Sequence, residues 1–265
     1  NDRLGLFCGT KFVNAPFTTT TGGTTSADFT GDPTDPSGSE AEVFYAYYPY
    51  SAHAVLEGSV VSGLSIPAVQ TFATKSFATE LCPMATSGAD YSRLAFRTIG
   101  TVLKFQVTGQ KNVTKIELTG NDGEALAGDY TIDFVGETPE MKFSGTETTL
   151  TLTCSKPVAL NDASATEFYF VLPAGIEFTK GITVKVYTDD NAEPMVKEYA
   201  SPLTTRPNKL VTVKAFTYSV PVTSIEEANE ALSKGTSGVT ITSTTDLTAP
   251  STLEIPNAFG HGTST

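Results

Sequence analysis

The sequence is poor in the side chains that most often carry out chemistry. Its 265 residues include no Trp, 2 His and 3 Cys, and only 17% of them are charged. Neither His has a partner at a zinc-ligand spacing, and no two Cys form a C-x2-C pair. The G-x-S-x-G, G-x-x-x-x-G-K-[ST] and G-x-G-x-x-G motifs are also missing. We therefore predict no catalytic, cofactor or metal site and expect a protein that is not an enzyme.

Long apolar runs and net positive charge are missing as well. No run approaches the roughly 18 apolar residues that cross a bilayer as a helix. The formal net charge is −12 and the sequence pI is about 4.6, so the chain repels phosphate backbones and anionic headgroups. We expect no nucleic-acid partner and no direct membrane binding. A hydrophobic share of 39%, with 16 Phe and 10 Tyr, is too high for a disordered chain.

The residues that are abundant favour β-strands. Roughly one residue in six is Thr, and short runs of Thr, Val, Phe and Tyr are bounded by Gly, Pro, Asn and Asp. In residues 103–107 and 182–186 apolar and polar side chains alternate, which is typical of an antiparallel strand with one face exposed to solvent. Further strands are predicted at Leu4–Cys8, Val43–Tyr48, Ala54–Val61, Val113–Leu118, Tyr130–Val135, Met141–Ser144, Thr149–Cys154, Phe168–Leu172, Val196–Tyr199 and Lys209–Tyr218. So many short strands without intervening helices predict an all-β fold of two antiparallel β-sandwich domains in tandem.

Breaks in this pattern suggest the domain boundaries. Residues 18–40, which we call the polar loop, lack an apolar period and are predicted to lie on the surface. A second break at residues 82–90 places the boundary between an N-terminal sandwich, residues 1–91, and a C-terminal sandwich, residues 92–218. The charge divides in the same way. The first segment carries 9 acidic and 3 basic residues, the second carries 15 and 13, and the remaining tail carries 5 and 1.

The tail, residues 219–265, contains the one convincing helix signal. Ser224 can cap a helix, and Glu227 three residues later completes a capping box before an apolar face that continues to Lys234. Short strands are expected afterwards at 239–241 and 252–255. A capped helix followed by short strands resembles the start of a right-handed parallel β-helix. A simpler alternative is an appendage packed on the second sandwich, because a solenoid needs several repeats to bury a core.

A cluster of aromatic residues offers one candidate ligand or interaction patch. Tyr45, Tyr47, Tyr48 and Tyr50, beside His53, could form a platform on which a sugar ring stacks. Successive strand residues point to opposite faces, so the pattern also predicts that part of this cluster belongs to the core.

The acidic and thiol side chains offer weaker candidates. Asp28, Asp32 and Asp35, with Glu40, could supply oxygens to calcium, but they lack the spacing of a calcium loop, and a solvated loop is the favoured interpretation. Of the three thiols, Cys8 and Cys82 could form a bridge within the first domain, whereas buried free thiols at Cys8, Cys82 and Cys154 are the commoner outcome in a chain of this size.

Several segments together resemble the fimbrillins of the Bacteroidetes, the subunits of type V pili. The resemblance covers roughly residues 1–218, and the tail departs from it. Its most specific part is the F-Y-A-Y-Y-P tract within Val43–Tyr50. The other segments are the opening D-R-L-G-L-F strand, Leu94–Phe105, Lys115–Gly120 and Leu126–Gly128.

This resemblance implies a cell-surface protein, exported as a lipoprotein precursor through the outer membrane and built from two transthyretin-like β-sandwiches. Fimbrillins polymerise when an extended strand of one subunit completes a sheet of its neighbour, so the implied partners are other fimbrial subunits, together with a host or bacterial surface protein or glycan. The abrupt start at Asn1 fits a mature form without its export segment. Since the tail departs from the family, the chain is expected to be a tip or accessory subunit.

Three hypotheses of function follow. The first is a non-enzymatic fimbrial subunit or adhesin that works by strand exchange and attachment. The second is a carbohydrate-binding module that uses the region Tyr45–His53. The third is the N-terminal part of a larger β-helix adhesin or enzyme that begins in the tail.

Overall fold

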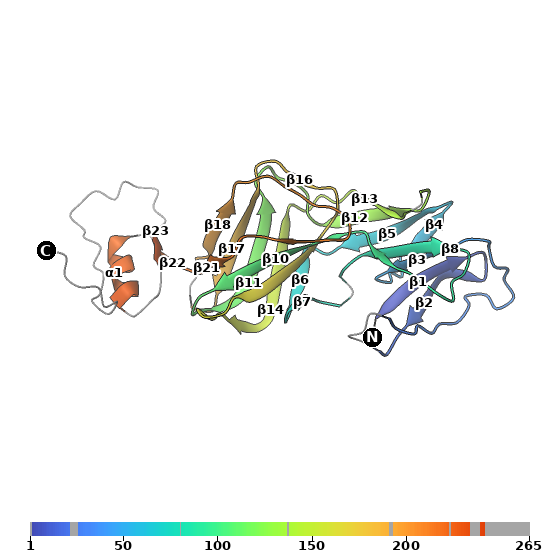
Figure 1. Cartoon of the computed structure of the whole chain (residues 1–265), viewed down its shortest axis with the longest axis horizontal. Helices are drawn as coiled ribbons and strands as arrows, with labels where there is room; N and C mark the ends of the chain where they lie inside the picture. Colours follow the sequence, from blue (N-terminus) through green and yellow to red (C-terminus); the bar gives the residue numbers. More distant parts are fainter. Residues whose placement is uncertain are drawn as a thin grey trace.

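The computed structural model of the chain is elongated, with three parts in a row (Figure 1). It describes residues 2–21, 26–79, 81–136, 138–190, 193–222, 224–233 and 239–241. Nearly all its regular elements are strands, which confirms the prediction of an all-β fold with two sandwiches and a C-terminal helix.

The first sandwich packs a five-stranded sheet against a four-stranded sheet. The five-stranded sheet has the order β2-β1-β3-β8-β9, with the bounds Phe12–Thr18, Arg3–Cys8, Phe44–Tyr48, Met84–Gly88 and Arg97–Thr98. The four-stranded sheet has the order β13-β12-β5-β4, with the bounds Glu140–Phe143, Gly128–Asp133, Val60–Ile66 and Val55–Glu57. Phe7 and Tyr47 of the first sheet share a buried cluster with Leu64 and Ile132 of the second.

The second sandwich is unequal, because a six-stranded sheet faces a much smaller one. The six-stranded sheet has the order β18-β17-β11-β14-β6-β7, with the bounds Met195–Tyr199, Ile182–Thr188, Asn112–Gly120, Thr149–Ala159, Val69–Ala73 and Ser76–Phe77. The facing sheet has the order β15-β10-β20, and β21 also pairs with β10; the bounds are Thr166–Leu172, Thr101–Thr108, Lys209–Thr212 and Phe216–Thr217. A short pair, β16 (Glu177–Phe178) and β19 (Leu203–Thr204), lies apart from both sheets.

Strand pairing crosses the predicted boundary at residue 91 in both directions. β6 and β7 precede that residue, yet β6 joins the second sandwich by pairing in parallel with β14. β12 and β13 follow that residue, yet β12 joins the first sandwich by pairing with β5. One buried cluster extends through both sandwiches, from Phe7 and Tyr47 to Phe105 and Phe170. The two halves therefore exchange strands and share a core.

Three details of the strand prediction are wrong. The run Ala54–Val61 is not one strand but the hairpin β4–β5, which turns at Gly58 with a φ of +62°. The expected break at residues 82–90 contains β8, a strand inside the five-stranded sheet. The run Lys209–Tyr218 is divided into β20 and β21, and both pair with β10 in parallel. Parallel neighbours require a long crossover, which local alternation cannot reveal.

The third part is a small β-α-β unit. Helix α1 (Ile225–Ser233) lies between β22 (Val220–Val222) and β23 (Val239–Ile241), and the two strands pair in parallel. The N–H of Glu227 donates to Ser224 Oγ at 3.1 Å, so the predicted helix cap is confirmed. The expected helix end at Lys234 and the strand at 252–255 lie outside the described residues. No helix in the described ranges is long and apolar enough to span a membrane.

Candidate interaction surfaces

The tyrosine segment does not form one exposed platform, because its central residue is in the core. Tyr47 is fully buried and stacks against Phe7 with 6.2 Å between ring centroids. Its hydroxyl donates to Asn14 Oδ1 at 2.7 Å and contacts the carbonyl of Ser51 at 2.9 Å. Burial raises the pKa of Tyr47, so this hydroxyl stays protonated. Tyr47 therefore holds the first sandwich together and is not available to a ligand.

The other four predicted patch residues face different surroundings. Tyr48 is buried, and Tyr45 is half-buried against Phe134. Tyr50 is half-buried, with the Arg3 guanidinium carbon 5.3 Å from its ring centroid, while His53 is exposed. Alternation along β3 thus sends neighbouring rings to opposite faces of the sheet.

The predicted calcium residues do not converge on one centre. Asp35 accepts hydrogen bonds from the N–H and hydroxyl of Ser37, at 2.9 and 2.7 Å, and these bonds lower its pKa. Glu40 accepts bonds from Lys11 at 2.6 Å and from Tyr91 at 2.9 Å. Across the described parts of the chain, no three His, Cys, Asp or Glu residues lie together in a way that could hold a metal ion.

All three cysteines are free, as one of the two sequence-based alternatives predicts. Cys8 and Cys82 are buried, and Cys154 is half-buried. Burial raises the pKa values of Cys82 and Cys154 to about 11, so both thiols are protonated and weakly nucleophilic near neutral pH.

The outer edge of β2 is covered by the polar loop. Thr18 exchanges two backbone hydrogen bonds with Thr30, at 2.8 and 2.9 Å, and the N–H of Val13 donates to Thr34 Oγ1 at 2.6 Å. The backbone of Pro16 faces the same edge as that of Thr18, because the two residues are two positions apart on the strand, and Pro16 has no N–H that could pair with another strand. The predicted surface loop therefore protects this edge from pairing with another strand.

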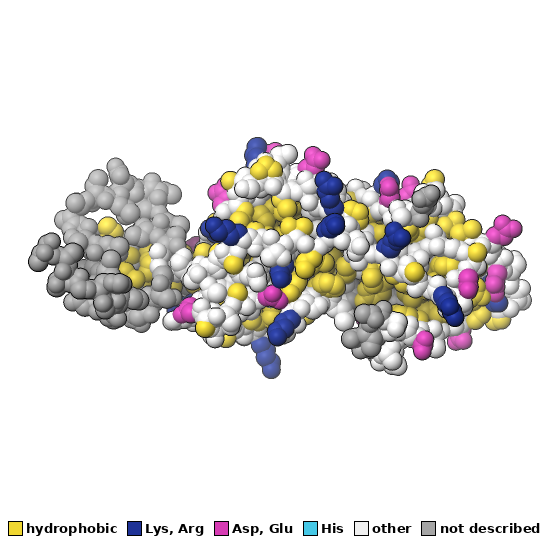
Figure 2. Space-filling view, viewed as in Figure 1, with side chains coloured by type: hydrophobic (Ala, Val, Ile, Leu, Met, Phe, Trp, Pro, Cys, Tyr) yellow, Lys and Arg dark blue, Asp and Glu magenta, His cyan; other side chains and the backbone are white. Residues whose placement is uncertain are grey.

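Exposed aliphatic side chains are concentrated on edge strands. Of the large apolar residues that face solvent, four lie on strands at the edges of four different sheets: Val13 on β2, Val55 on β4, Val196 on β18 and Leu210 on β20. Figure 2 shows apolar side chains exposed along much of both sandwiches, with charged groups scattered between them. An apolar side chain on an unpaired edge favours contact with another chain.

The edge strand β20 carries the most exposed of these four side chains. Leu210 is 57% exposed, and within the described ranges no strand pairs with β20 on the side away from β10. β20 also lies at the end of the smaller sheet of the second sandwich. That sheet consists of β15, β10 and, on the other side of β10, the two short strands β20 and β21, and it faces a sheet of six strands. The outer backbone groups of β20 are therefore the place in the smaller sheet where an added strand would pair.

Tyr199 connects the six-stranded sheet of the second sandwich to the segment between β20 and β21. The hydroxyl of Tyr199, on β18, donates to the carbonyl of Lys214 at 2.7 Å, between β20 and β21. The ring of Tyr199 also contacts Phe105 and Phe216, with centroid distances of 6.4 Å in both cases. This contact closes the gap beyond Thr212 and leaves β20 itself uncovered. Sequence patterns did not indicate this edge, because the run Lys209–Tyr218 gives no sign of its neighbours.

Comparisons with known proteins add little to this picture. No protein-family model matches the chain, and no curated protein matches it. A candidate cell adhesion protein from Bacteroides fragilis NCTC 9343, known from a crystal structure, is similar over 82% of this chain and 80% of that chain, with a TM-score of 0.43 and 12% sequence identity. A likeness at this level carries no argument about function, so function has to be inferred from the chain's own residues.

Proposed function

We propose that the chain is a non-enzymatic cell-surface adhesin that serves as a tip or accessory subunit of a pilus and binds other subunits by β-strand donation. The resemblance to fimbrillins and the two-sandwich fold support this role. In the proposed setting the chain reaches the surface as a lipoprotein precursor, and its partners are other fimbrial subunits.

The observation that carries the proposal is the unequal second sandwich. Its smaller sheet ends at β20, where Leu210 projects 57% exposed from an edge without a strand partner in the described residues. An added strand would pair with the free backbone groups of β20 and cover Leu210. At β2 the polar loop already bonds the backbone groups of the edge, which opposes the addition of a strand there. The edge of β2 is therefore covered, whereas the outer side of β20 has no strand partner among the described residues.

A pair of matched substitutions tests the proposal. Leu210→Lys places a charge on the open edge, and Val13→Lys places the same charge on the covered edge, where Val13 is 52% exposed. Charged residues on an edge strand oppose pairing with another strand. The masses of the purified wild type and both variants are measured by light scattering over a range of protein concentrations.

We expect the wild type and Val13→Lys to form concentration-dependent oligomers, and Leu210→Lys to remain monomeric. Circular dichroism establishes that both variants fold. Equal assembly by the two variants, or a wild type that remains monomeric throughout, contradicts strand addition at β20 between copies of this chain.

The tail supports a second candidate, the start of a parallel β-helix. β22 and β23 pair in parallel, with Val220 opposite Val239, and helix α1 lies between them. Parallel pairing of short strands separated by one short connection is typical of a solenoid coil. The intact mass of the native polypeptide tests this candidate: a β-helix domain requires many residues beyond Thr265, and a native chain that ends near Thr265 excludes it.

A further inference from the structure

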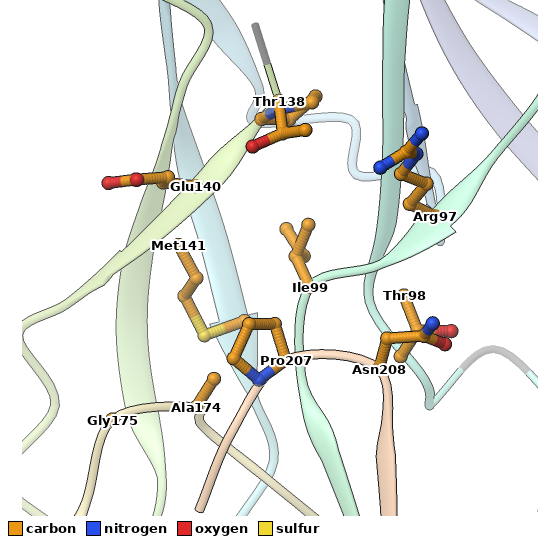
Figure 3. Close-up of a pocket in the computed structure, with 11 residues that line it drawn as sticks. Arg97, Thr98, Ile99, Thr138, Glu140, Met141, Ala174, Gly175, Pro207 and Asn208 are labelled. Atoms are coloured by element: carbon orange, nitrogen blue, oxygen red, sulfur yellow. The ribbon is translucent and has the colours of Figure 1, made fainter. Parts of the chain in front are cut away.

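A cavity of about 410 Å³ that is partly open to solvent lies between the two sandwiches. Its walls come from β9, from β13 with the residues before it, from the turn at Ala174 and Gly175, and from the residues that lead into β20. Figure 3 shows Ile99, Met141 and Pro207 around its centre, with Arg97 at one side and Glu140 at the other. Elements far apart in the sequence thus converge on one small space of a size typical for ligand pockets.

Among the described residues that line the cavity, Arg97 is the one cationic side chain, and it has no carboxylate partner there. Arg97 lines the cavity and is exposed, and no ion pair or hydrogen bond of its guanidinium is found in the described part of the chain. Glu140 is held by Lys142 Nζ at 2.7 Å, and its carboxylate points away from Arg97 in Figure 3. An Arg that has no partner among the described residues and lies beside a cavity is suited to an anionic ligand, and its charge acts locally against the repulsion that a net charge of −12 exerts on anions. A planar guanidinium binds a carboxylate through two parallel hydrogen bonds.

The remaining lining combines an apolar surface with neutral polar groups. Ile99 is buried and Met141 half-buried, and together with Pro207 they provide carbon atoms that a ligand's apolar face can cover. Thr138 and Asn208 add a hydroxyl and an amide to the lining. Asn208 has a φ of +56°, a left-handed conformation that the backbone holds at the cavity wall.

The backbone around the cavity has few donors to offer. The N–H groups of Ile99, Gly175 and Asn208 already donate to the carbonyls of Pro83, Thr205 and Gly100, at 2.9, 3.0 and 3.1 Å. An incoming peptide strand needs free backbone groups, whereas a compact ligand can be recognised by side chains alone. The site therefore suits a small anionic ligand better than an added strand.

We propose that this cavity binds an acidic sugar residue of a glycan. The Arg97 guanidinium holds the sugar carboxylate, the side chains of Thr138 and Asn208 bond its hydroxyl groups, and Met141 and Pro207 cover the apolar face of the ring. Both sialic and uronic acids have this combination of a carboxylate, hydroxyl groups and an apolar ring face. The inference does not require strand addition, because Arg97 lies on β9; Pro207 and Asn208, however, lead directly into β20.

Calorimetric titration of the purified chain tests the proposal. The probes are the methyl glycosides of N-acetylneuraminic acid and of glucuronic acid, which distinguish the two sources of the carboxylate, with methyl glucoside as the neutral control. Arg97→Gln is compared with Arg93→Gln, which removes the same charge from an exposed arginine outside the cavity.

We expect at least one acidic glycoside to bind and methyl glucoside not to bind. Arg97→Gln should weaken binding by about tenfold or more, because a charge-assisted pair is lost, and Arg93→Gln should leave it unchanged. Leu210→Lys should also leave it unchanged, so the failure of one proposal does not imply the failure of the other.

The proposal is overturned if neither acidic glycoside binds, if methyl glucoside binds equally well, or if the two arginine variants bind alike. An acetylated Asp-Glu dipeptide amide is titrated in parallel. If it binds in an Arg97-dependent manner while both acidic sugars do not, the ligand is an acidic peptide and the proposed sugar is wrong. Circular dichroism of both variants separates loss of binding from loss of folding.

Discussion

The side-chain amide of Gln70 bonds both backbone groups of Val171. Nε2 of Gln70 donates to the Val171 carbonyl at 2.8 Å, and the Val171 N–H donates to Oε1 of Gln70 at 2.9 Å. Both residues are buried, Gln70 on β6 and Val171 on β15. The amide thus takes the place of a neighbouring strand at the outer edge of β15. The outer edge of β15 is therefore bonded at Val171, whereas no described strand pairs with the outer side of β20.

Gln70→Ala should lower the free energy of unfolding by about 2–4 kcal/mol, because it leaves a buried N–H and a buried carbonyl without partners. Gln106→Ala is the control, since Gln106 is half-buried and makes one long bond of 3.4 Å to Glu167. That change should cost less than about 0.5 kcal/mol. Urea denaturation measures both values. Equal costs for the two variants would show that the contact with Val171 contributes nothing.

Tyr47→Phe should lower the free energy of unfolding by about 1–3 kcal/mol. The substitution keeps the ring in the core but removes the hydroxyl that bonds Asn14 and Ser51. Tyr50→Phe is the matched control, because its ring is half-buried and no hydrogen bond of its hydroxyl is found in the described structure. Thermal and urea unfolding compare the two. If Tyr50→Phe costs as much as Tyr47→Phe, the hydroxyl of Tyr47 is not a stabilising feature.

Alkaline pH should destabilise the fold between about pH 9 and pH 12. Burial raises the pKa of Cys82 from 9.0 to about 11 and that of Tyr199 from 10.0 to about 12. Within this window the folded chain keeps protons that the unfolded chain has lost, so stability is present at lower pH and falls as the pH rises. Melting temperatures measured from pH 8 to pH 11 should therefore decrease.

Cys82→Ala provides the control for this pH dependence, because it removes one of the two thiol contributions that start near pH 9. The other comes from Cys154, whose pKa burial also raises to about 11, so the decline should become shallower but persist. A melting temperature that stays constant or rises over the same range would contradict the direction of both pKa shifts.

Local sequence patterns predicted the strands whose buried face alternates regularly. Leu103, Phe105 and Val107 on β10, like Ile182, Val184 and Val186 on β17, are all buried, as the alternation predicts. The N-cap of α1 could be predicted equally well, because Ser224 and the Glu227 N–H that it accepts from lie within one turn of the chain. In each case the physical signal is contained in a few consecutive residues.

Pairing between distant segments could not be predicted in this way. Met84–Gly88 reads as polar, with Ala85 its one fully buried residue, yet it lies between β3 and β9. The hydrogen bonds of Gln70 depend on Val171, about a hundred residues later in the chain. The cavity residue Arg97 is likewise distinguished by its neighbours from other segments. Contacts of this kind are set by topology, which a single strand does not encode.

Amide hydrogen exchange at β20 tests the central claim, strand addition at this edge, most directly. Exchange is followed by mass spectrometry in dilute monomer and in assembled protein, for segments that contain Lys209–Thr212 and, as a control, Phe12–Thr18 of the covered edge. We expect assembly to slow exchange at β20 and to leave β2 unchanged, because an added strand protects amides that were open to water. Unchanged exchange at β20 in the assembled protein, or new protection at β2 alone, would contradict the claim.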